Sequence, residues 1–138
     1  MTLEREPMPG LGAARPQVFI DDMAVGQELP VVVRNASRVQ LFLYSAATWN
    51  PHRIHYDVDY ARFEGHPDVI VHGPLQGAWL SQYVTDWAGP HARLGSMTFR
   101  MRTSVFPDDT MTFSGTVTET TTDDAGCGWV SVDVALMV

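Results

Sequence analysis

Lysine is absent from this chain, cysteine occurs once, and no long hydrophobic run is present. The basic residues are scattered arginines and the net charge is −7, so the basic stripe that nucleic-acid binding requires is missing. The single Cys127 excludes an internal disulfide framework and a cysteine-based metal cluster within one chain. The apolar stretches reach only about ten residues, far short of a membrane span. We therefore expect a soluble, cytoplasmic protein without a signal peptide.

The length and composition fit one compact domain. The chain has 138 residues, of which 45% are hydrophobic, so it can bury a core but is too short for two ordinary domains. Residues 1–16 are rich in proline, glycine and charge without any periodicity. We expect a flexible N-terminal arm over 1–16 and a single domain over 17–138.

Two short helices are predicted from their caps. Ser37 can cap a helix over 38–47, where apolar residues fall on one face. Asp57 can cap a second helix, which begins at Val58 and ends at Gly65.

A third helix is predicted over 75–87. Pro74 stands at a first-turn position, which favours a helix start. The residues that follow are apolar nearly all round, as expected of a helix that other structure surrounds.

Most of the remaining chain has β character. Strands are predicted at four places: 29–34, 96–102, 110–118 and 129–137. Apolar and polar residues alternate in the last two, and aspartate-containing turns precede each of them. This order of elements predicts an α+β domain in which an antiparallel β-sheet wraps around a central α-helix, the hot-dog fold.

The residues with the most chemical potential lie between Thr48 and Asp57. In the run Thr-Trp-Asn-Pro-His-Arg-Ile-His-Tyr-Asp, two histidines, an arginine and an aspartate crowd a broken helix end. A third histidine, His72, precedes Gly73 at the start of the long helix.

These residues resemble the motif of MaoC-like (R)-specific enoyl-CoA hydratases and 3-hydroxyacyl-thioester dehydratases. In that family Asp-x-Asn-Pro-x-His ends a helix, and a His-Gly pair later enters the central helix. This chain has Asn50-Pro51, His55 and His72-Gly73, but Thr48 replaces the aspartate and two extra residues precede His55. The variant is similar to a branch that includes mesaconyl-C4-CoA hydratases and mitochondrial-type 3-hydroxyacyl-thioester dehydratases.

Two further runs, 82–90 and 109–115, resemble actinobacterial MaoC-like hydratases of steroid side-chain degradation. The resemblance implies a role in fatty acid or steroid metabolism. It implies an acyl-CoA or acyl-carrier thioester as substrate, acid–base catalysis without a metal or redox cofactor, and a homodimer or a heteromer with another MaoC-like chain.

The chemistry of hydration gives the candidate residues their roles. Water addition to a 2-enoyl thioester needs a base, a proton donor for the α-carbon and hydrogen-bond donors for the enolate-like oxygen. His55 suits the base, and the Gly73 N–H at a helix start suits the oxygen. Thr48 and Asn50 can orient the water or the imidazole.

The other polar residues have weaker assignments. Arg53 can contact a carboxylate or phosphate of the substrate. His52 and His72 either contact the substrate or hold a loop, and Asp57 fits a helix cap better than an acid. A zinc site from His52 and His55 lacks enough ligands.

Two alternatives remain open. A hot-dog thioesterase usually carries an acidic group on the central helix, where this chain has Gln76 near the start and Asp86 at the far end. The replacement at Thr48 would also suit a non-catalytic subunit that completes the substrate tunnel of a heteromeric hydratase.

Overall fold

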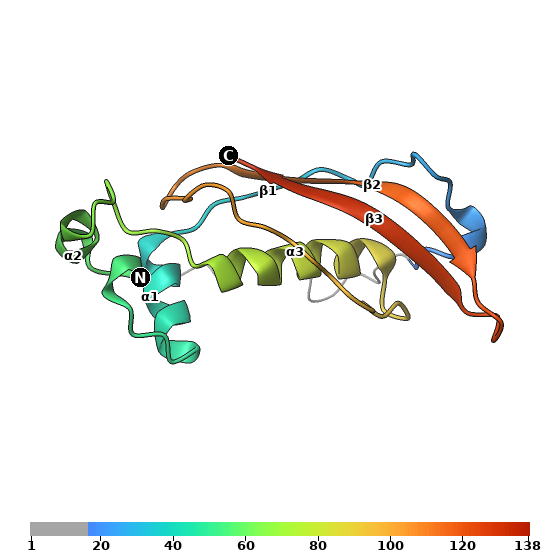
Figure 1. Ribbon diagram of the computed structural model, residues 1–138, viewed down its shortest axis with the longest axis horizontal. Helices are drawn as coiled ribbons and strands as arrows, with labels where there is room; N and C mark the ends of the chain where they lie inside the picture. The colour runs from blue at the N-terminus through green and yellow to red at the C-terminus, as the bar shows by residue number, and fades with distance from the viewer. Residues whose placement is uncertain (1–16) are drawn as a thin grey trace, which may run out of the picture.

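The computed structural model describes residues 17–138, so the predicted arm over 1–16 lies outside the described residues. Two short 3-10 helices, three α-helices and three β-strands follow one another along the chain (Figure 1). They are η1 (Ile20–Asp22), β1 (Val32–Arg34), α1 (Arg38–Ala47), η2 (Arg53–His55), α2 (Val58–Phe63), α3 (Gly73–Ala88), β2 (Met111–Thr122) and β3 (Gly128–Met137).

The strands form one antiparallel sheet in the order β1-β2-β3. Phe113 of β2 lies opposite Val32 on one side and Leu136 on the other, which makes β2 the central strand. Every second residue from Met111 to Val117 is buried, as the alternation in the sequence predicts. The buried residues therefore lie on one face of the sheet, and a helix can pack against that apolar face.

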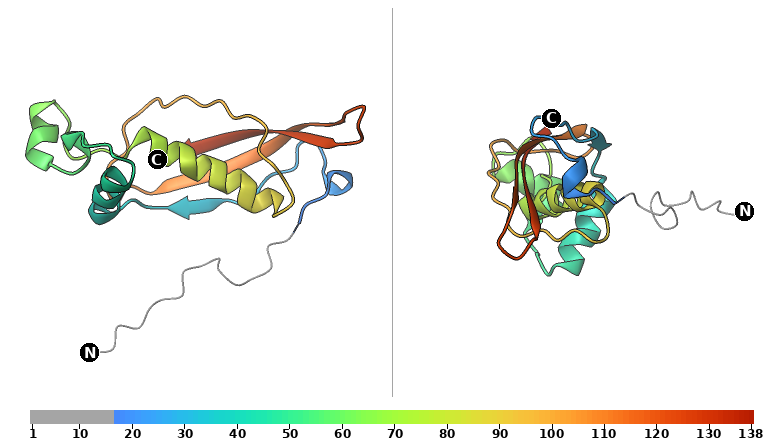
Figure 2. Two further views of the ribbon diagram at one scale, coloured as in Figure 1. Left: turned by 90° about the horizontal axis from the view of Figure 1, so that it is seen from below. Right: turned by 90° about the vertical axis from the view of Figure 1, so that its right-hand side faces the viewer.

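Helix α3 runs along that apolar face, with the sheet on one side and the loop after α3 on another (Figures 1 and 2). Its side chains Leu75, Trp79, Leu80 and Tyr83 are buried. The Tyr83 ring lies 6.1 Å from that of Phe113, which joins helix and sheet. This arrangement of a sheet around a central helix confirms the predicted α+β hot-dog fold.

The strand predicted over 96–102 is wrong. The described sheet has three strands, and this segment is extended chain that belongs to none of them. Within the described chain it passes over α3 instead, where the Phe99 ring lies so close to Gly77 that a Cβ there would be 2.5 Å from Phe99 Cζ. An alternating pattern produces a strand only where a neighbouring backbone offers ladder hydrogen bonds, and none does so here.

The caps fix the helical segment that carries the candidate residues. Ser37 Oγ accepts a hydrogen bond from Gln40 N at 3.2 Å, and α1 has the bounds predicted for it. Asp57 Oδ1 accepts from Tyr60 N at 3.1 Å and so caps α2, as predicted. Gly65 follows α2 with φ +92°, a conformation that favours glycine. Together α1, η2 and α2 lie at one end of the sheet, near the start of α3 (Figures 1 and 2).

Candidate active site at the start of α3

The η2 segment is attached to the chain that leads into α3. Ile70 N donates to Ile54 O at 3.0 Å, and Val71 N donates to Val105 O at 2.8 Å. These backbone bonds hold the residues before α3 between η2 and the loop that precedes β2. His55, the last residue of η2, is thereby placed beside the entrance to α3.

His55 is buried, with 8% of its surface exposed. Its Nδ1 lies 2.8 Å from Ile70 O. Because a carbonyl oxygen only accepts, the hydrogen of the neutral ring is on Nδ1 and the lone pair is on Nε2. The backbone thus sets the tautomer in which Nε2 can take a proton.

His72 lies directly behind His55 and is fully buried. The two imidazole rings are stacked, with 3.7 Å between centroids and 18° between planes. His72 Nε2 lies 2.8 Å from Ser45 Oγ on α1, while His72 Nδ1 has no hydrogen-bond partner. The Tyr44 ring packs edge-on against His72, with 4.8 Å between centroids. His72 is therefore enclosed by side chains.

Burial lowers the pKa of both histidines. For His55 the main cause is desolvation, which the hydrogen bond to Ile70 opposes and the nearby His52 reinforces. For His72 desolvation, with a smaller contribution from the charge of His55, lowers the pKa to about 4. Both rings are accordingly neutral at pH 7, which is the state that a general base requires.

Gly73 is the first residue of α3, a helix of 16 residues. The first N–H groups of a helix have no partner within it, and the helix dipole favours negative charge at this end. A Cβ built on Gly73 would meet nothing within 4 Å, so the backbone here borders open space. The Gly73 N–H is thus available for an oxygen that gains negative charge.

A comparison with protein families matches residues 24–107, more than half of the chain, to hydroxyacyl-thioester dehydratase type 2. The chain belongs to this family. The match confirms the resemblance to MaoC-like hydratases and dehydratases that the motif around His55 indicates.

Relatives of known name agree with this assignment. The 3-oxo-4,17-pregnadiene-20-carboxyl-CoA hydratase beta subunit of Mycobacterium tuberculosis is 34% identical over 94 residues, which cover 68% of this chain and 73% of the relative. Mesaconyl-C(4)-CoA hydratase of Chloroflexus aurantiacus is 54% identical over 43 residues, which cover 30% of this chain and only 15% of the relative. Among solved structures, the ChsH1-ChsH2 complex from M. tuberculosis has a TM-score of 0.66 at 28% identity, covering 82% of this chain and 94% of that chain.

Thr48 and Asn50 use their hydrogen bonds on the backbone around them. Thr48 Oγ1 donates to Tyr44 O at 2.7 Å and closes the end of α1. Asn50 Oδ1 accepts from His52 N at 3.4 Å. At the position where the MaoC-like motif described above has an aspartate, this chain has a hydroxyl turned toward its own helix. The structure brings His55, His72 and Gly73 together, whereas Thr48 ends α1 and Asn50 lies in the loop between α1 and η2.

Arg53 and His52 lie on the outer side of η2. Arg53 Nε donates to Asp57 Oδ2 at 3.0 Å, and its guanidinium lies 4.6 Å from the centroid of the Tyr60 ring. The pKa of Asp57 is lowered, mainly by its hydrogen bond from Arg53 and to a smaller extent by the one from Tyr60 N. His52 is exposed, its ring centroid lies 6.2 Å from that of His55, and its Nδ1 accepts from Ile54 N at 3.4 Å. Both side chains are exposed, and both also stabilise the loop.

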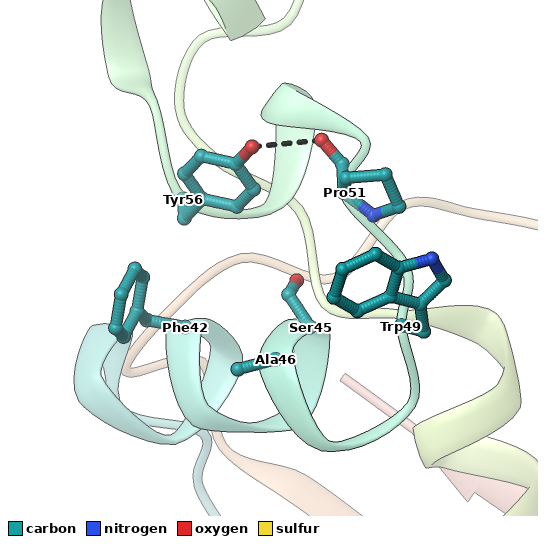
Figure 3. A pocket seen from close by; sticks show the side chains of 6 residues that line it. All are labelled: Phe42, Ser45, Ala46, Trp49, Pro51 and Tyr56. Atoms are coloured by element: carbon teal, nitrogen blue, oxygen red, sulfur yellow. Dashed lines mark hydrogen bonds between the residues drawn. The ribbon is translucent and has the colours of Figure 1, made fainter.

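An open apolar hollow of about 180 Å³ lies between α1 and the loop after it (Figure 3). The side chains that line it are Phe42, Ser45, Ala46, Trp49, Pro51 and Tyr56. The Ser45 hydroxyl projects toward this hollow in Figure 3, and on its buried side it meets His72. Sequence reasoning did not single out Ser45, Tyr44 or the Ile70 carbonyl as parts of the site. The one available signal was a serine, Ser45, on the apolar face of a helix.

Residues 17–138 contain no group of three or more histidine, cysteine, aspartate or glutamate side chains arranged to hold a metal ion. In the same residues, no helix combines the length and the apolar character needed to cross a membrane.

The buried His72 makes the stability of the protein dependent on pH. Its pKa is about 4 in the folded chain against an ordinary 6.5, so the unfolded chain binds the proton more tightly. Stability is therefore lost as the pH falls from 6.5 toward 4, by about 3 kcal/mol for this group. The phenylalanine of His72→Phe does not titrate. Between pH 7 and pH 4 we therefore expect the free energy of unfolding of this variant to fall by about 3 kcal/mol less than that of the wild type. Urea unfolding of both proteins at the two pH values measures the difference; equal losses would show that folding does not lower the pKa of His72.

Proposed function

We propose that the chain catalyses the reversible hydration of a 2-enoyl-CoA thioester, which in reverse is the dehydration of a 3-hydroxyacyl-CoA. The observation that carries the proposal is the buried, neutral His55. The Ile70 carbonyl holds its Nδ1–H, so Nε2 carries a lone pair beside the start of α3. Membership in the hydroxyacyl-thioester dehydratase family supports the same reaction.

The proposed mechanism assigns two groups of this chain. His55 Nε2 accepts a proton from water as the water oxygen bonds to C3 of the enoyl group. The electrons of the double bond move toward the thioester oxygen, which the Gly73 N–H stabilises. The imidazolium of His55 then returns a proton to C2, so that the sum is addition of one water. One residue can serve both transfers because the ring is neutral before and after the cycle.

The remaining candidates have supporting roles in this proposal. Thr48 and Asn50 shape the loop that carries His55, and Arg53 and His52 face outward, where they can contact polar parts of a CoA substrate. We propose that the working unit is a homodimer or a heteromer with another MaoC-like chain, which the solved complex of a relative supports. A single domain over 17–138 and a cytoplasmic location stay predictions.

The test of the reaction is an assay of the purified protein against 2-enoyl-CoA esters of different chain length and branching. Hydration removes the absorbance of the enoyl thioester without releasing free CoA, whereas hydrolysis releases a thiol. We expect loss of absorbance alone. The position of Gln76 supports this outcome: it is buried, and its Nε2 donates to Val71 O at 3.3 Å, so the start of α3 offers no acidic group at that position for hydrolysis.

A non-catalytic subunit is the second candidate. The orientation of the Thr48 hydroxyl toward Tyr44 O favours it, since the aspartate of the MaoC-like motif is missing at this position. If this candidate is right, the chain alone hydrates no enoyl-CoA but supports activity with a co-expressed MaoC-like partner, even as His55→Ala. If the proposed function is right, the same substitution abolishes activity with or without the partner.

The pH profile provides a test of the base. Burial lowers the pKa of His55 below 6.5, so its neutral form persists to lower pH than that of an exposed histidine. We expect kcat/KM to fall on the acid side with a midpoint below pH 6.5. Measurements of kcat/KM between pH 4.5 and pH 8.5 give the midpoint, and a midpoint above 6.5 would contradict a buried, neutral base.

A further inference from the structure

His72 is a buried titratable group to which the proposed mechanism gives no role. It is fully buried, so it cannot contact the substrate from this chain's surface. Nevertheless it covers one face of the His55 ring at 3.7 Å between centroids and is joined to Ser45 Oγ at 2.8 Å. Ser45, His72 and His55 come from three separate segments: α1, the entrance to α3, and η2.

We propose that Ser45 and His72 form a positioning pair that holds the His55 ring in its reactive orientation and confines the catalytic proton to His55 Nε2. This inference rests on the proposed function of His55. It assigns His72 a place behind the base, away from the substrate.

The geometry supports the first half of the proposal. The bond from Nδ1 to Ile70 O fixes one edge of the His55 ring but still permits the ring to turn about that bond. The stacked His72 ring blocks this rotation on one side. The Tyr44 ring packs edge-on against His72, and Ser45 binds its Nε2, so the blocking ring is itself held.

The hydrogen bonds of His72 indicate its tautomer. Nδ1 is buried without a partner, and a buried N–H without an acceptor costs more than a bare lone pair on an aromatic nitrogen. The hydrogen is therefore on Nε2, and Ser45 Oγ accepts it. Removal of the Ser45 hydroxyl would leave this N–H without an acceptor and would enlarge the apolar hollow that Ser45 borders.

The surrounding charges support the second half. Ser45 and Tyr44 of α1 face His72, while His52 of η2 lies 6.2 Å from His55, with Tyr60 of α2 beyond it. Within residues 17–138, the side chains in contact with His72 are Ser45, Tyr44 and His55, and none of them is a carboxylate that would stabilise a charged ring. Two imidazolium rings stacked face to face would repel each other strongly in a buried site. The pair therefore takes up one proton, on the ring whose Nε2 is free.

The first experiment compares Ser45→Ala with Ser81→Ala. Ser81 is a matched control because it is a partly buried helical serine whose Oγ donates to Gly77 O at 3.0 Å, away from His55. We expect Ser45→Ala to lower kcat about tenfold, the scale of a small misplacement of a reacting group, with KM within about twofold of wild type. Ser81→Ala should leave both unchanged. A wild-type kcat for Ser45→Ala would overturn the positioning role.

The second experiment compares His72→Ala with His72→Phe. Alanine opens a void beside His55 and admits water, so the pKa of His55 should rise toward 6.5 and the acid limb of kcat/KM should move to higher pH. Phenylalanine keeps the cover, so the acid limb should stay in place. It lacks the bond to Ser45 Oγ that holds the covering ring, so kcat should fall. An unchanged limb in His72→Ala, or an unchanged kcat in His72→Phe, would overturn the proposal. If the alanine variant does not fold by circular dichroism, Ser45→Ala and His72→Phe decide.

NMR separates this inference from the proposed function. The Cε1–H resonance of His55, assigned by its loss in His55→Asn, reports the titration of the ring in the absence of substrate. If the wild-type protein hydrates no enoyl-CoA but His72→Ala still raises the pKa of His55, the proposed function fails and the control of His55 by His72 stands. If the pKa of His55 is the same in the wild-type protein and in His72→Ala, the inference fails whatever the activity.

Discussion

Substitution of His55 by alanine is expected to lower kcat/KM for enoyl-CoA hydration by at least about a hundredfold, the usual effect of removing a general base. The reason is the geometry of the ring: Ile70 O occupies Nδ1, and only Nε2 remains to take the proton from water. The loss should fall mainly on kcat, because the imidazole acts in the transition state and contributes little to binding the CoA portion. Initial rates of absorbance loss for wild type and variant measure it.

Two further variants separate catalysis from structure in this result. In His55→Asn the side-chain amide can still donate to Ile70 O, so the local fold is kept while the base is absent; we expect the same loss as for alanine. His91→Ala removes an exposed histidine in the turn after the far end of α3, and it should change kcat/KM by less than about threefold. Near-wild-type activity of His55→Asn would show that the hydrogen bond to Ile70, and not proton transfer, is what the residue provides.

The helices and the long strands could be predicted because their signals are local. Ser37 and Asp57 each satisfy a free N–H at a helix start, so the cap residue alone determines where α1 and α2 begin. The alternation in β2 predicts its buried face in the same way. The segment 96–102 has an equally good local pattern, but a strand also needs a neighbouring backbone, and that depends on the tertiary arrangement.

The candidate site could be predicted only in part for a related reason. His55 and Gly73 were predicted through a motif and the chemistry of a helix start, and the structure brings their segments together. The stacking of His72 on His55 and its bond to Ser45 join residues 17 and 27 positions apart, and no periodicity in the sequence encodes such contacts. The position of His72 directly before Gly73 suits a substrate contact as well as a support behind the base. The burial of its ring, which decides between these roles, is known only from the structure.

Addition of a single methyl group at Gly73 is expected to reduce hydration by about tenfold or more without weakening the fold. A Cβ at this position meets nothing within 4 Å, so the chain itself has room for alanine. The nitrogen and the Cβ are bonded to the same Cα, however, so a thioester whose oxygen accepts from that N–H must pass close to the added methyl group. Mutations that remove one such hydrogen-bond donor cost about a hundredfold or more, and partial displacement of the oxygen should cost a fraction of that.

The measurement pairs kcat/KM with the thermal unfolding midpoint for Gly73→Ala and for Pro74→Ala. Pro74 is the matched control because it is exposed in the same first turn of α3 and its substitution adds no atom at position 73. We expect Gly73→Ala to keep the wild-type midpoint and lose activity, with a larger loss in Gly73→Val, and Pro74→Ala to keep its activity. Full activity in Gly73→Ala and Gly73→Val would contradict binding of the thioester oxygen by that N–H, because the thioester would then lie against both added side chains.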